Sequence, residues 1–244
     1  MTVRTDAAQL LVERVVALCD DVFGTVESLR TATATAVADA LPRRPQRGDL
    51  AAIETIAAAA LLRPEGLVVG AGFVAEPGAL RDETYWLEWW TYPDAVQVLR
   101  LAVESDPDAP AFRDYTRLPW FQVPRRTGRR QVTGPYVDYL CTDEYTLTFT
   151  APVVVAGRFA GVVGADVFAR TVELRLGSLL GHVPEPAAIV NAQGRVVAGN
   201  EGAPVTGDLL REVVPLWDLP ATPGGDHPRL YRCGDLPFAL VVGV

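Results

Sequence analysis

The residue with the clearest chemical potential is Asp166, which follows an apolar run in the segment RFAGVVGADVF (158–168). Side chains alternate between the two faces of a β-strand, so Asp166 is expected to share a face with Ala160 and Gly164. Small side chains leave room above a sheet, and a carboxylate beside that room can orient a cationic ligand. Spacing alone fits equally well a structural acid that caps the next helix or pairs with an arginine.

Two further segments carry candidates for the same sheet. EYTLTFTAPVVV (144–155) predicts the partner strand of a hairpin that turns at 156–157. Thr148 belongs to a row of hydroxyls at every second position, which indicates one wet face and one core face. The second segment is the aromatic stretch ETYWLEWWTY (83–92). Alternation puts Trp89 and Trp90 on opposite faces of it, so that the aromatic residues of one face line the core and those of the other face are available to a pocket. A single tryptophan is more often a core residue than a ligand contact.

The composition excludes several classes of function. All 22 basic residues are arginine, which removes lysine Schiff-base chemistry and the P-loop lysine and is typical of a high-GC bacterial genome. A net charge of -8 argues against nucleic acid as a direct partner. The basic cluster RRTGRR (125–130) predicts a solvated loop, and the stretch before it (114–121) an irregular one. His182 and His227 lie in Pro- and Gly-rich surroundings, so we expect no catalytic residue, no metal site and no cofactor.

The chain carries no pattern of a secreted or membrane protein. Its cysteines, Cys19, Cys141 and Cys233, are odd in number and lack CxxC spacing, which favours reduced, partly buried thiols. No apolar run reaches about 18 residues, and no charged-then-apolar signal opens the chain. We therefore expect a cytoplasmic protein without a membrane span.

The pattern of apolar residues predicts an α+β fold in three parts. Residues 1–65 form a helical segment, with one long amphipathic helix over about 6–41 and a second helix capped by Asp49. Residues 66–182 form a larger antiparallel sheet unit, and residues 183–244 a smaller β-β-α-β-β unit. The first helix is longer than one small domain needs, so we expect a homodimer that pairs through it.

Four motifs in the middle of the chain carry a resemblance to a known family. RDYTRLPWF, GPYVD, LTFTAPV and GRFAGVVGADV occur in this order up to Val167. The set resembles the RPWY, PYVD, TFSAPV and GVVGADI motifs of Cache sensor domains. The resemblance implies a double Cache module, with a long N-terminal helix followed by two PAS-like sheets, and a small-molecule ligand over the larger sheet. Family members usually sit outside the membrane, tethered to receptors, kinases or cyclases.

The resemblance also implies residue roles. Asp166 matches the aspartate that binds the ligand's ammonium in amino-acid- and amine-binding Cache domains, and Asp138 matches a second such position, although it also suits a turn. The aromatic walls of the site would come from Trp120, Phe121 and Tyr136. Aromatic faces beside a carboxylate suit an ammonium or quaternary amine, with a cation–π attraction of about 0.5–2 kcal/mol.

Two departures from the family pattern narrow the ligand. The arginine that clamps a ligand carboxylate in amino-acid-binding relatives is replaced by Leu118, while the neighbouring Arg117 would point elsewhere on an extended backbone. Phe121 stands where the family has tyrosine and lacks its hydroxyl. An α-amino acid needs a cation for its carboxylate as well as an anion for its amine. A small amine or other ligand without an α-carboxylate is therefore favoured.

Three functions remain open from the sequence. The leading hypothesis is a sensory protein that binds a small amine or amino-acid-like metabolite and signals by dimerisation or through a separate regulatory protein. An enzyme with Asp and Tyr acid–base chemistry is the second. The third is an interaction module without a pocket, which side chains filling the space above Gly164 would favour.

Overall fold

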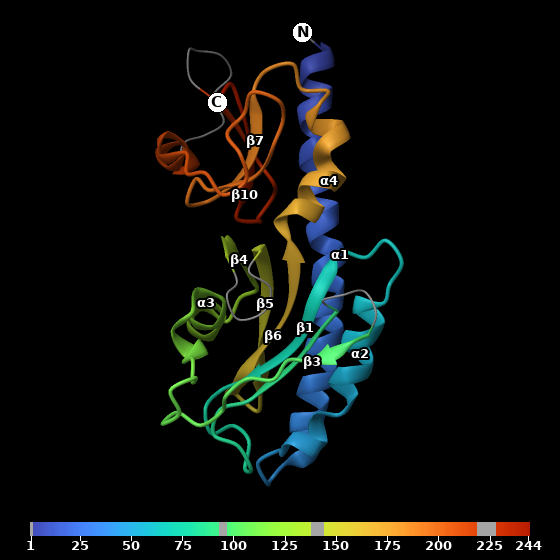
Figure 1. The fold of residues 1–244 in the computed structure, drawn as a ribbon, viewed down its shortest axis with the longest axis vertical. Helices are drawn as coiled ribbons and strands as arrows, with labels where there is room; N and C mark the ends of the chain where they lie inside the picture. The colour runs from blue at the N-terminus through green and yellow to red at the C-terminus, as the bar shows by residue number, and fades with distance from the viewer. Residues whose placement is uncertain (1, 93–96, 138–143, 219–227) are drawn as a thin grey trace. The chain divides into compact units, whose positions relative to one another are not determined.

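The protein is described by a computed structural model that covers residues 2–92, 97–137, 144–218 and 228–244. The chain folds into two compact units. The larger unit comprises residues 22–133 and 148–167, and the smaller unit comprises the remainder, residues 1–21, 134–147 and 168–244. The predicted α+β class is confirmed, with one long N-terminal helix and two antiparallel sheets (Figure 1).

Helix α1 (Thr2–Ala40) confirms the long helix expected from the apolar periodicity. The side chains at three- and four-residue steps are buried along it, among them Leu11, Val15, Val22 and Leu29. Its second half belongs to the larger unit, where the ring of Phe23 meets Phe149 of the sheet edge-to-face with centroids 5.2 Å apart. The helix therefore forms part of the core of that unit.

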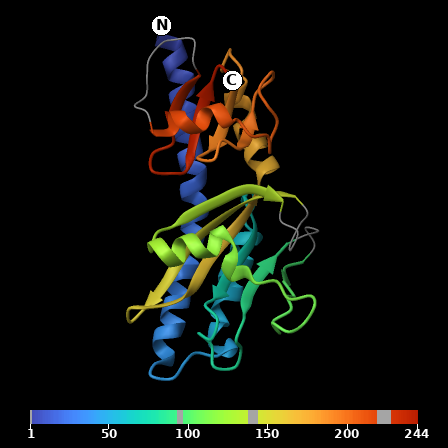
Figure 2. The same cartoon turned by 90° about the vertical axis from the view of Figure 1, so that its left-hand side faces the viewer.

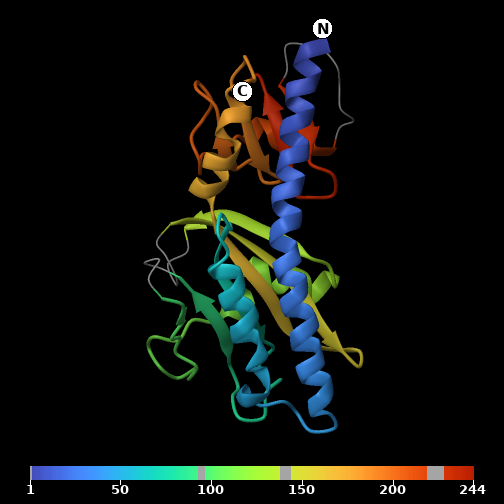
Figure 3. The same cartoon turned by 90° about the vertical axis from the view of Figure 1, so that its right-hand side faces the viewer.

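A six-stranded sheet, most of which lies in the larger unit, carries the candidate residues in the strand order β3-β2-β1-β6-β5-β4. The strands are β1 (Val68–Ala75), β2 (Leu87–Thr91), β3 (Leu99–Arg100), β4 (Gln131–Val137), β5 (Tyr145–Val155) and β6 (Arg158–Phe168). Strand β1 pairs antiparallel with both β2 and β6. Helices α1 and α2 (Ala52–Leu61) lie on one face of this sheet, the side seen in Figure 3, and α3 (Pro119–Thr127) lies on the other (Figure 2).

The hairpin of β5 and β6 has the turn that the sequence predicts. Ala156 and Gly157, the two residues between the strands, have φ values of 49° and 75°. Positive φ at both central residues is the backbone of a type I′ turn, whose twist matches that of the flanking strands. The turn therefore fixes the pairing of the two longest strands of the sheet.

The irregular stretch expected at 114–121 is wrong, because two helices begin in it; the cluster at 125–130 is exposed as expected, but its first three residues belong to α3. Residues Tyr115–Arg117 form a short 3-10 helix, η2, and α3 follows directly. Pro119 occupies the first turn of α3, and Gly128, with φ 67°, ends it in the left-handed conformation. Proline at the start and glycine just past the end are common helix boundaries. Arg125 and Arg126 thus lie in the last turn of α3, where positive charge is favourable.

The predicted cap of the second helix is also wrong. Asp49 lies in a 3-10 turn, η1 (Arg47–Leu50), and α2 begins after Ala51. The Asp49 carboxylate accepts the backbone N–H of Gln46 at 2.8 Å and both terminal nitrogens of Arg43. It therefore closes the turn that precedes α2 and does not cap α2 itself.

The smaller unit holds a four-stranded sheet in the order β8-β7-β10-β9. Its elements are α4 (Ala169–Leu180), β7 (Ala187–Asn191), β8 (Val196–Gly199), η3 (Arg211–Asp218), β9 (Arg229–Arg232) and β10 (Phe238–Val242). The helix expected between its strands is the 3-10 helix η3, whose Val213 is buried against Val190 and Val241. Cys19 and Cys233 are buried, and Cys141 lies outside the described residues. Within the described part of the chain, no helix has the length and apolar character needed to cross a membrane.

Candidate functional site

Strand register gathers the candidate residues on one face of the larger sheet. Directly opposite residues of an antiparallel pair point to the same face. Asp166 lies opposite Gly70, and Gly72 lies opposite both Gly164 on one side and Trp89 on the other. The alternation expected for β6 at Gly164 and Asp166 is therefore confirmed, and the tryptophan that joins them from β2 is Trp89.

Helix α3 covers this same face. The hydroxyl of Thr150, whose methyl carbon lies near Gly164, donates a hydrogen bond of 2.9 Å to the backbone carbonyl of Trp120. The Thr150 hydroxyl thus points to the side of the sheet that α3 covers, whereas the neighbouring Phe149 packs on Phe23 of α1 on the other side. The hydroxyls of β5 do share one face, but the expectation that this face is wet is wrong, because Thr146, Thr148 and Thr150 are all buried.

Asp166 is a buried carboxylate with a defined donor. Its side chain is 6% exposed, and Oδ1 accepts a hydrogen bond of 2.7 Å from the Thr148 hydroxyl. A buried carboxylate requires such partners because burial removes its hydration. The alternative role as a helix cap does not hold, since the N-cap of α4 is Phe168 and no side chain caps that helix.

The indole of Trp89 lies beside Asp166. A Cβ atom placed on Gly70 would be 2.9 Å from Trp89 Nε1 and 3.1 Å from Asp166 Oδ2. The Trp89 side chain is 6% exposed, and its Nε1 is buried without a hydrogen-bond partner among the described residues. The indole N–H and the carboxylate thus both pack closely over Gly70 and leave no room there for a side chain.

The far end of that indole occupies the space above Gly164. A Cβ on Gly164 would lie 3.2 Å from Trp89 Cη2 and 2.8 Å from the backbone oxygen of Phe149. The small residues of β6 therefore make room for an aromatic ring, in contrast to the open floor that the sequence suggests. That ring forms a wall next to Asp166.

Trp120 and Phe121, both expected to line the site, are held in an aromatic cluster at the start of α3. Trp120 is 9% exposed and stacks on Tyr115 with centroids 6.5 Å apart. Phe121 is fully buried and packs against Tyr115 and Phe159. Phe121 is thus a core residue of the α3 contact, and the backbone carbonyl of Trp120 links α3 to β5 by accepting the Thr150 hydroxyl.

Tyr115 is a structural residue of this region that sequence reasoning missed. Its hydroxyl donates to the Ala75 carbonyl at 2.8 Å and accepts the Trp86 backbone N–H at 3.2 Å. Burial raises the pKa of Tyr115 above its ordinary value, so the phenol stays neutral at physiological pH. The signal was its place in the DYTRLPWF motif, one turn before Trp120.

Arg117, Tyr136 and Asp138, the other predicted site residues, lie outside the larger sheet's Gly70–Asp166 register pairs. Arg117 lies on η2 with its side chain 83% exposed, and it pairs with Asp114 at 3.0 Å. Tyr136 is half-buried on β4, within the segment 134–147 that belongs to the smaller unit. Asp138 lies outside the described residues.

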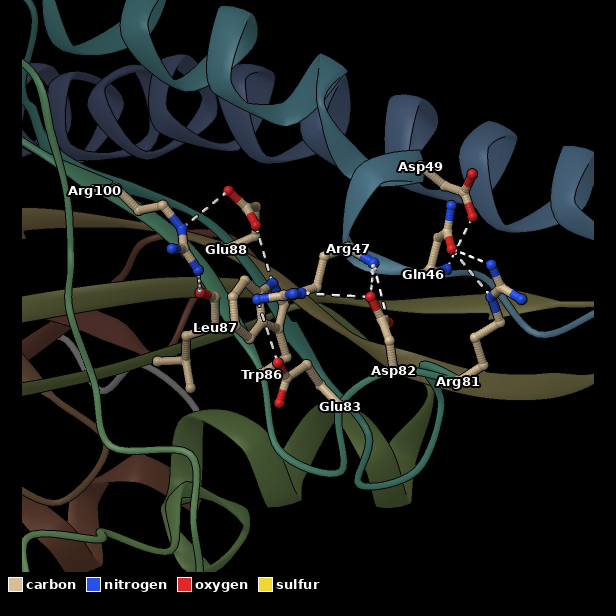
Figure 4. Close-up of polar contacts among 10 residues, drawn as sticks. All are labelled: Gln46, Arg47, Asp49, Arg81, Asp82, Glu83, Trp86, Leu87, Glu88 and Arg100. Carbon is tan, nitrogen blue, oxygen red and sulfur yellow. Dashed lines mark hydrogen bonds and ion pairs between the residues drawn. The ribbon is translucent and has the colours of Figure 1, made fainter.

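Trp86, one residue before β2, anchors the strand that carries Trp89 (Figure 4). The ring of Trp86 lies between two guanidinium groups, with the Cζ of Arg100 at 4.3 Å and that of Arg47 at 5.0 Å from its centroid. Its indole N–H donates to Glu88 at 2.9 Å, and Glu88 also pairs with Arg100 at 3.3 Å. Arg47 in turn pairs with the acidic loop before β2 through Asp82. This bracing fixes the start of β2 and hence the position of Trp89.

The comparisons with known proteins concern the fold and the central segment of the chain. Residues 100–173 match the family model described as "Methyl-accepting chemotaxis protein-like, first PDC sensor domain". Over the whole chain, the fold is similar to that of Methyl-accepting Chemotaxis protein X, with a TM-score of 0.62, 16% identity, and coverage of 100% of this chain and 99% of that one.

Two amino-acid chemoreceptors of Pseudomonas aeruginosa PAO1 have similar ligand-binding domains. PctC in complex with GABA gives a TM-score of 0.58 at 18% identity, covering 98% of this chain and 96% of that one. PctB in complex with L-Arg gives 0.59 at 19% identity, with 98% and 93% covered. The resemblance read from the sequence is thus confirmed: the chain has the double Cache (PDC) fold of chemoreceptor ligand-binding domains, and its central segment matches the family model of their first sensor domain.

Proposed function

We propose that the chain is a sensory module that binds a small amine or amino-acid-like metabolite at Asp166. The observation that carries this proposal is the buried carboxylate of Asp166, which lies beside the indole of Trp89 on the sheet face covered by α3. A buried carboxylate with an aromatic neighbour favours an ammonium group over a neutral or anionic ligand. The complexes of PctC with GABA and PctB with L-Arg support the same ligand class.

The absence of the family's arginine favours ligands that lack an α-carboxylate. Its position is taken by Leu118, the N-cap residue of α3, and the neighbouring Arg117 is exposed and paired with Asp114. An α-carboxylate would need a cation in that place. Amines, amino alcohols and ω-amino acids suit the site better than α-amino acids.

A ligand screen tests the proposal. Thermal unfolding and isothermal titration calorimetry would be measured with ethanolamine, choline, GABA, L-arginine and L-valine, and with acetate and succinate as anions. We expect amines to raise the melting temperature and the anions to have no effect. In Asp166→Asn the affinity for amines should fall on the order of tenfold or more, because a charge-assisted contact is lost.

The matched control is Asp106→Asn, the same change at an exposed loop position. It should leave amine affinity unchanged. Failure of every amine to bind or stabilise the protein would overturn the proposed function.

An interaction module without a ligand is the second candidate, because the Trp89 ring fills the space above Gly164. The same screen separates the two functions. Signalling by dimerisation or through a separate regulatory protein, and a cytoplasmic location, belong to the proposal as well. Multi-angle light scattering at micromolar concentration, with and without the best amine, would test the dimer, and a monomer under both conditions would contradict it.

A further inference from the structure

Helix α3 contains a proline that interrupts its own hydrogen bonding. Pro124 lies inside the helix and has no N–H, so the carbonyl four residues earlier, that of Trp120, lacks the donor that residue 124 of a regular helix would supply. The Thr150 hydroxyl of β5 donates to this same carbonyl at 2.9 Å. A side chain of the sheet thus supplies the hydrogen bond that the proline removes from the helix.

This bond links the stability of α3 to its position on the sheet. The helix has nine residues and an internal proline, whereas a helix that is marginally stable by itself in water needs about 12–15 residues. Thr150 is 1% exposed, so its hydroxyl reaches Trp120 only while α3 lies against β5. We therefore expect α3 to leave the sheet and to unfold in one local step.

The remaining attachments of this segment set how rare that step is. Arg125, in the last turn of α3, pairs with Glu76, but the two side chains are 52% and 21% exposed, and exposed ion pairs contribute little. Phe121 is fully buried against Tyr115 and Phe159 and must be exposed when the helix leaves. The burial of Phe121 keeps the open state a minor one.

The sheet face under α3 is closely packed while the helix is in place (Figure 2). A Cβ on Gly164 would lie 3.0 Å from Thr150 Cγ2 and 3.2 Å from Trp89 Cη2. Thr150 thus lies next to Gly164, two residues before Asp166 on β6. A ligand reaches Asp166 from this side only after the face has been uncovered.

We propose that α3 is a cover over the Asp166 face that opens by local unfolding, and that Thr150 is the positioning residue that holds it closed. The inference rests on the proposed function for the identity of the site. Thr150 acts on the ligand through α3 and does not touch it. Because only molecules with an open cover admit a ligand, the open fraction limits the rate of association.

Amide hydrogen exchange of the unchanged protein tests the opening without any ligand. We expect the protection factors of the α3 amides to be at least about tenfold lower than those of the central amides of β6. Equal protection in α3 and β6, falling in parallel when urea is added, would mean that α3 opens only when the whole unit unfolds. That result would overturn the inference.

A double-mutant cycle tests the role of Thr150. Thr150→Val keeps the shape of the side chain and should raise the exchange rate of the α3 amides about fivefold, because a buried hydrogen bond is lost. Pro124→Ala returns an N–H to the helix, so Thr150→Val should have a clearly smaller effect in that background. Thr150→Ser should restore the original rate, and Thr33→Val, whose hydroxyl bonds within α1, should not change it. Equal effects of Thr150→Val in both backgrounds would overturn the role of Thr150.

The kinetics of binding link the cover to the site. Stopped-flow tryptophan fluorescence with ethanolamine should show association about fivefold faster in Thr150→Val than in the unchanged protein. If α3 exchanges faster in the variant but association does not, the ligand enters by another route, so the cover is disproved and the proposed function stands. If no amine of the ligand screen binds, the proposed function fails and α3 has no site to cover.

Discussion

The hydroxyl of Thr148 on β5 donates a 2.7 Å hydrogen bond to Oδ1 of Asp166 on β6, and both side chains are buried. The second oxygen of the carboxylate lies toward Gly70 and Trp89. The two oxygens of Asp166 therefore have different surroundings, one facing the Thr148 hydroxyl and one facing Gly70 and the Trp89 indole. A carboxylate oriented before binding loses little freedom when it meets a cation, which favours affinity.

The Thr148 hydroxyl should be needed both for stability and for ligand binding. Thr148→Val keeps the shape of the side chain and removes the donor to Asp166. We expect the free energy of unfolding to fall by about 1–3 kcal/mol, because a buried charged group loses a hydrogen bond. Urea unfolding followed by circular dichroism would measure this, and calorimetry should show weaker amine binding.

Two variants sharpen that experiment. Thr148→Ser restores the hydroxyl and should recover most of the affinity. Thr33→Val changes another fully buried threonine of the larger unit, whose hydroxyl donates to Leu29 of its own helix. If Thr33→Val weakens amine binding as much as Thr148→Val does, the effect is one of general stability and the role of Thr148 is disproved.

Gly70 should be intolerant of any side chain for the sake of the site. In Gly70→Ala the new methyl group would lie 2.9 Å from Trp89 Nε1 and 3.1 Å from Asp166 Oδ2. We expect loss of detectable amine binding together with a stability cost of about 1–3 kcal/mol from overpacking. The matched change is Gly24→Ala at an exposed helix position with nothing within 4 Å, which should stabilise the protein by about 0.5–1 kcal/mol. Retention of amine affinity in Gly70→Ala would place the ligand elsewhere.

The sequence predicts those features of the site that depend on local periodicity. The hairpin of β5 and β6, its turn at 156–157 and the shared face of Gly164 and Asp166 follow from alternation and turn preference. Which face of β2 joins them does not follow. It depends on the pairing of Gly72 with Trp89, a contact between distant segments that no local pattern specifies.

Two other features stay hidden in the sequence for different physical reasons. Helix α3 contains Pro124 and two arginines in nine residues, so its boundary signals, Pro119 and Gly128, are easily taken for those of a loop. Strict alternation along β6 would put Phe159 on the face opposite that of Asp166, yet its ring meets Phe121 of α3 edge-to-face. Gly161 lies between Phe159 and Gly164 in β6, and its φ of 147° interrupts the regular alternation of side chains along the strand.

The stacking of Arg100 on Trp86 should contribute to the stability of β2. Arg100→Met keeps much of the aliphatic contact and removes both the cation above the ring and the ion pair with Glu88. We expect the free energy of unfolding to fall by about 0.5–2 kcal/mol. Arg100→Lys should recover only part of this loss, because an ammonium group is not planar and cannot stack parallel to the ring as a guanidinium does.

The control for Arg100 is Arg126→Met, at an exposed position on α3, which should change stability by no more than about 0.5 kcal/mol. Urea unfolding of the three variants would give the comparison. Equal losses in Arg100→Met and Arg126→Met would mean that the stacked arginine contributes nothing specific.

Asp49 should give the larger unit an acid-sensitive contribution to stability. Hydrogen bonds from Arg43, and then from the backbone N–H of Gln46, lower the pKa of Asp49 to about 2. A carboxyl whose pKa is lower in the folded than in the unfolded chain stabilises the fold above its unfolded pKa, about 4, and this contribution disappears as the pH falls from about 4 to 2. The difference in urea midpoint between the unchanged protein and Asp49→Asn should therefore shrink over that range. Arg43→Gln, which removes the main donor, should show the same trend, whereas a difference that stays constant down to about pH 2 would show that the pairing with Arg43 does not stabilise the fold.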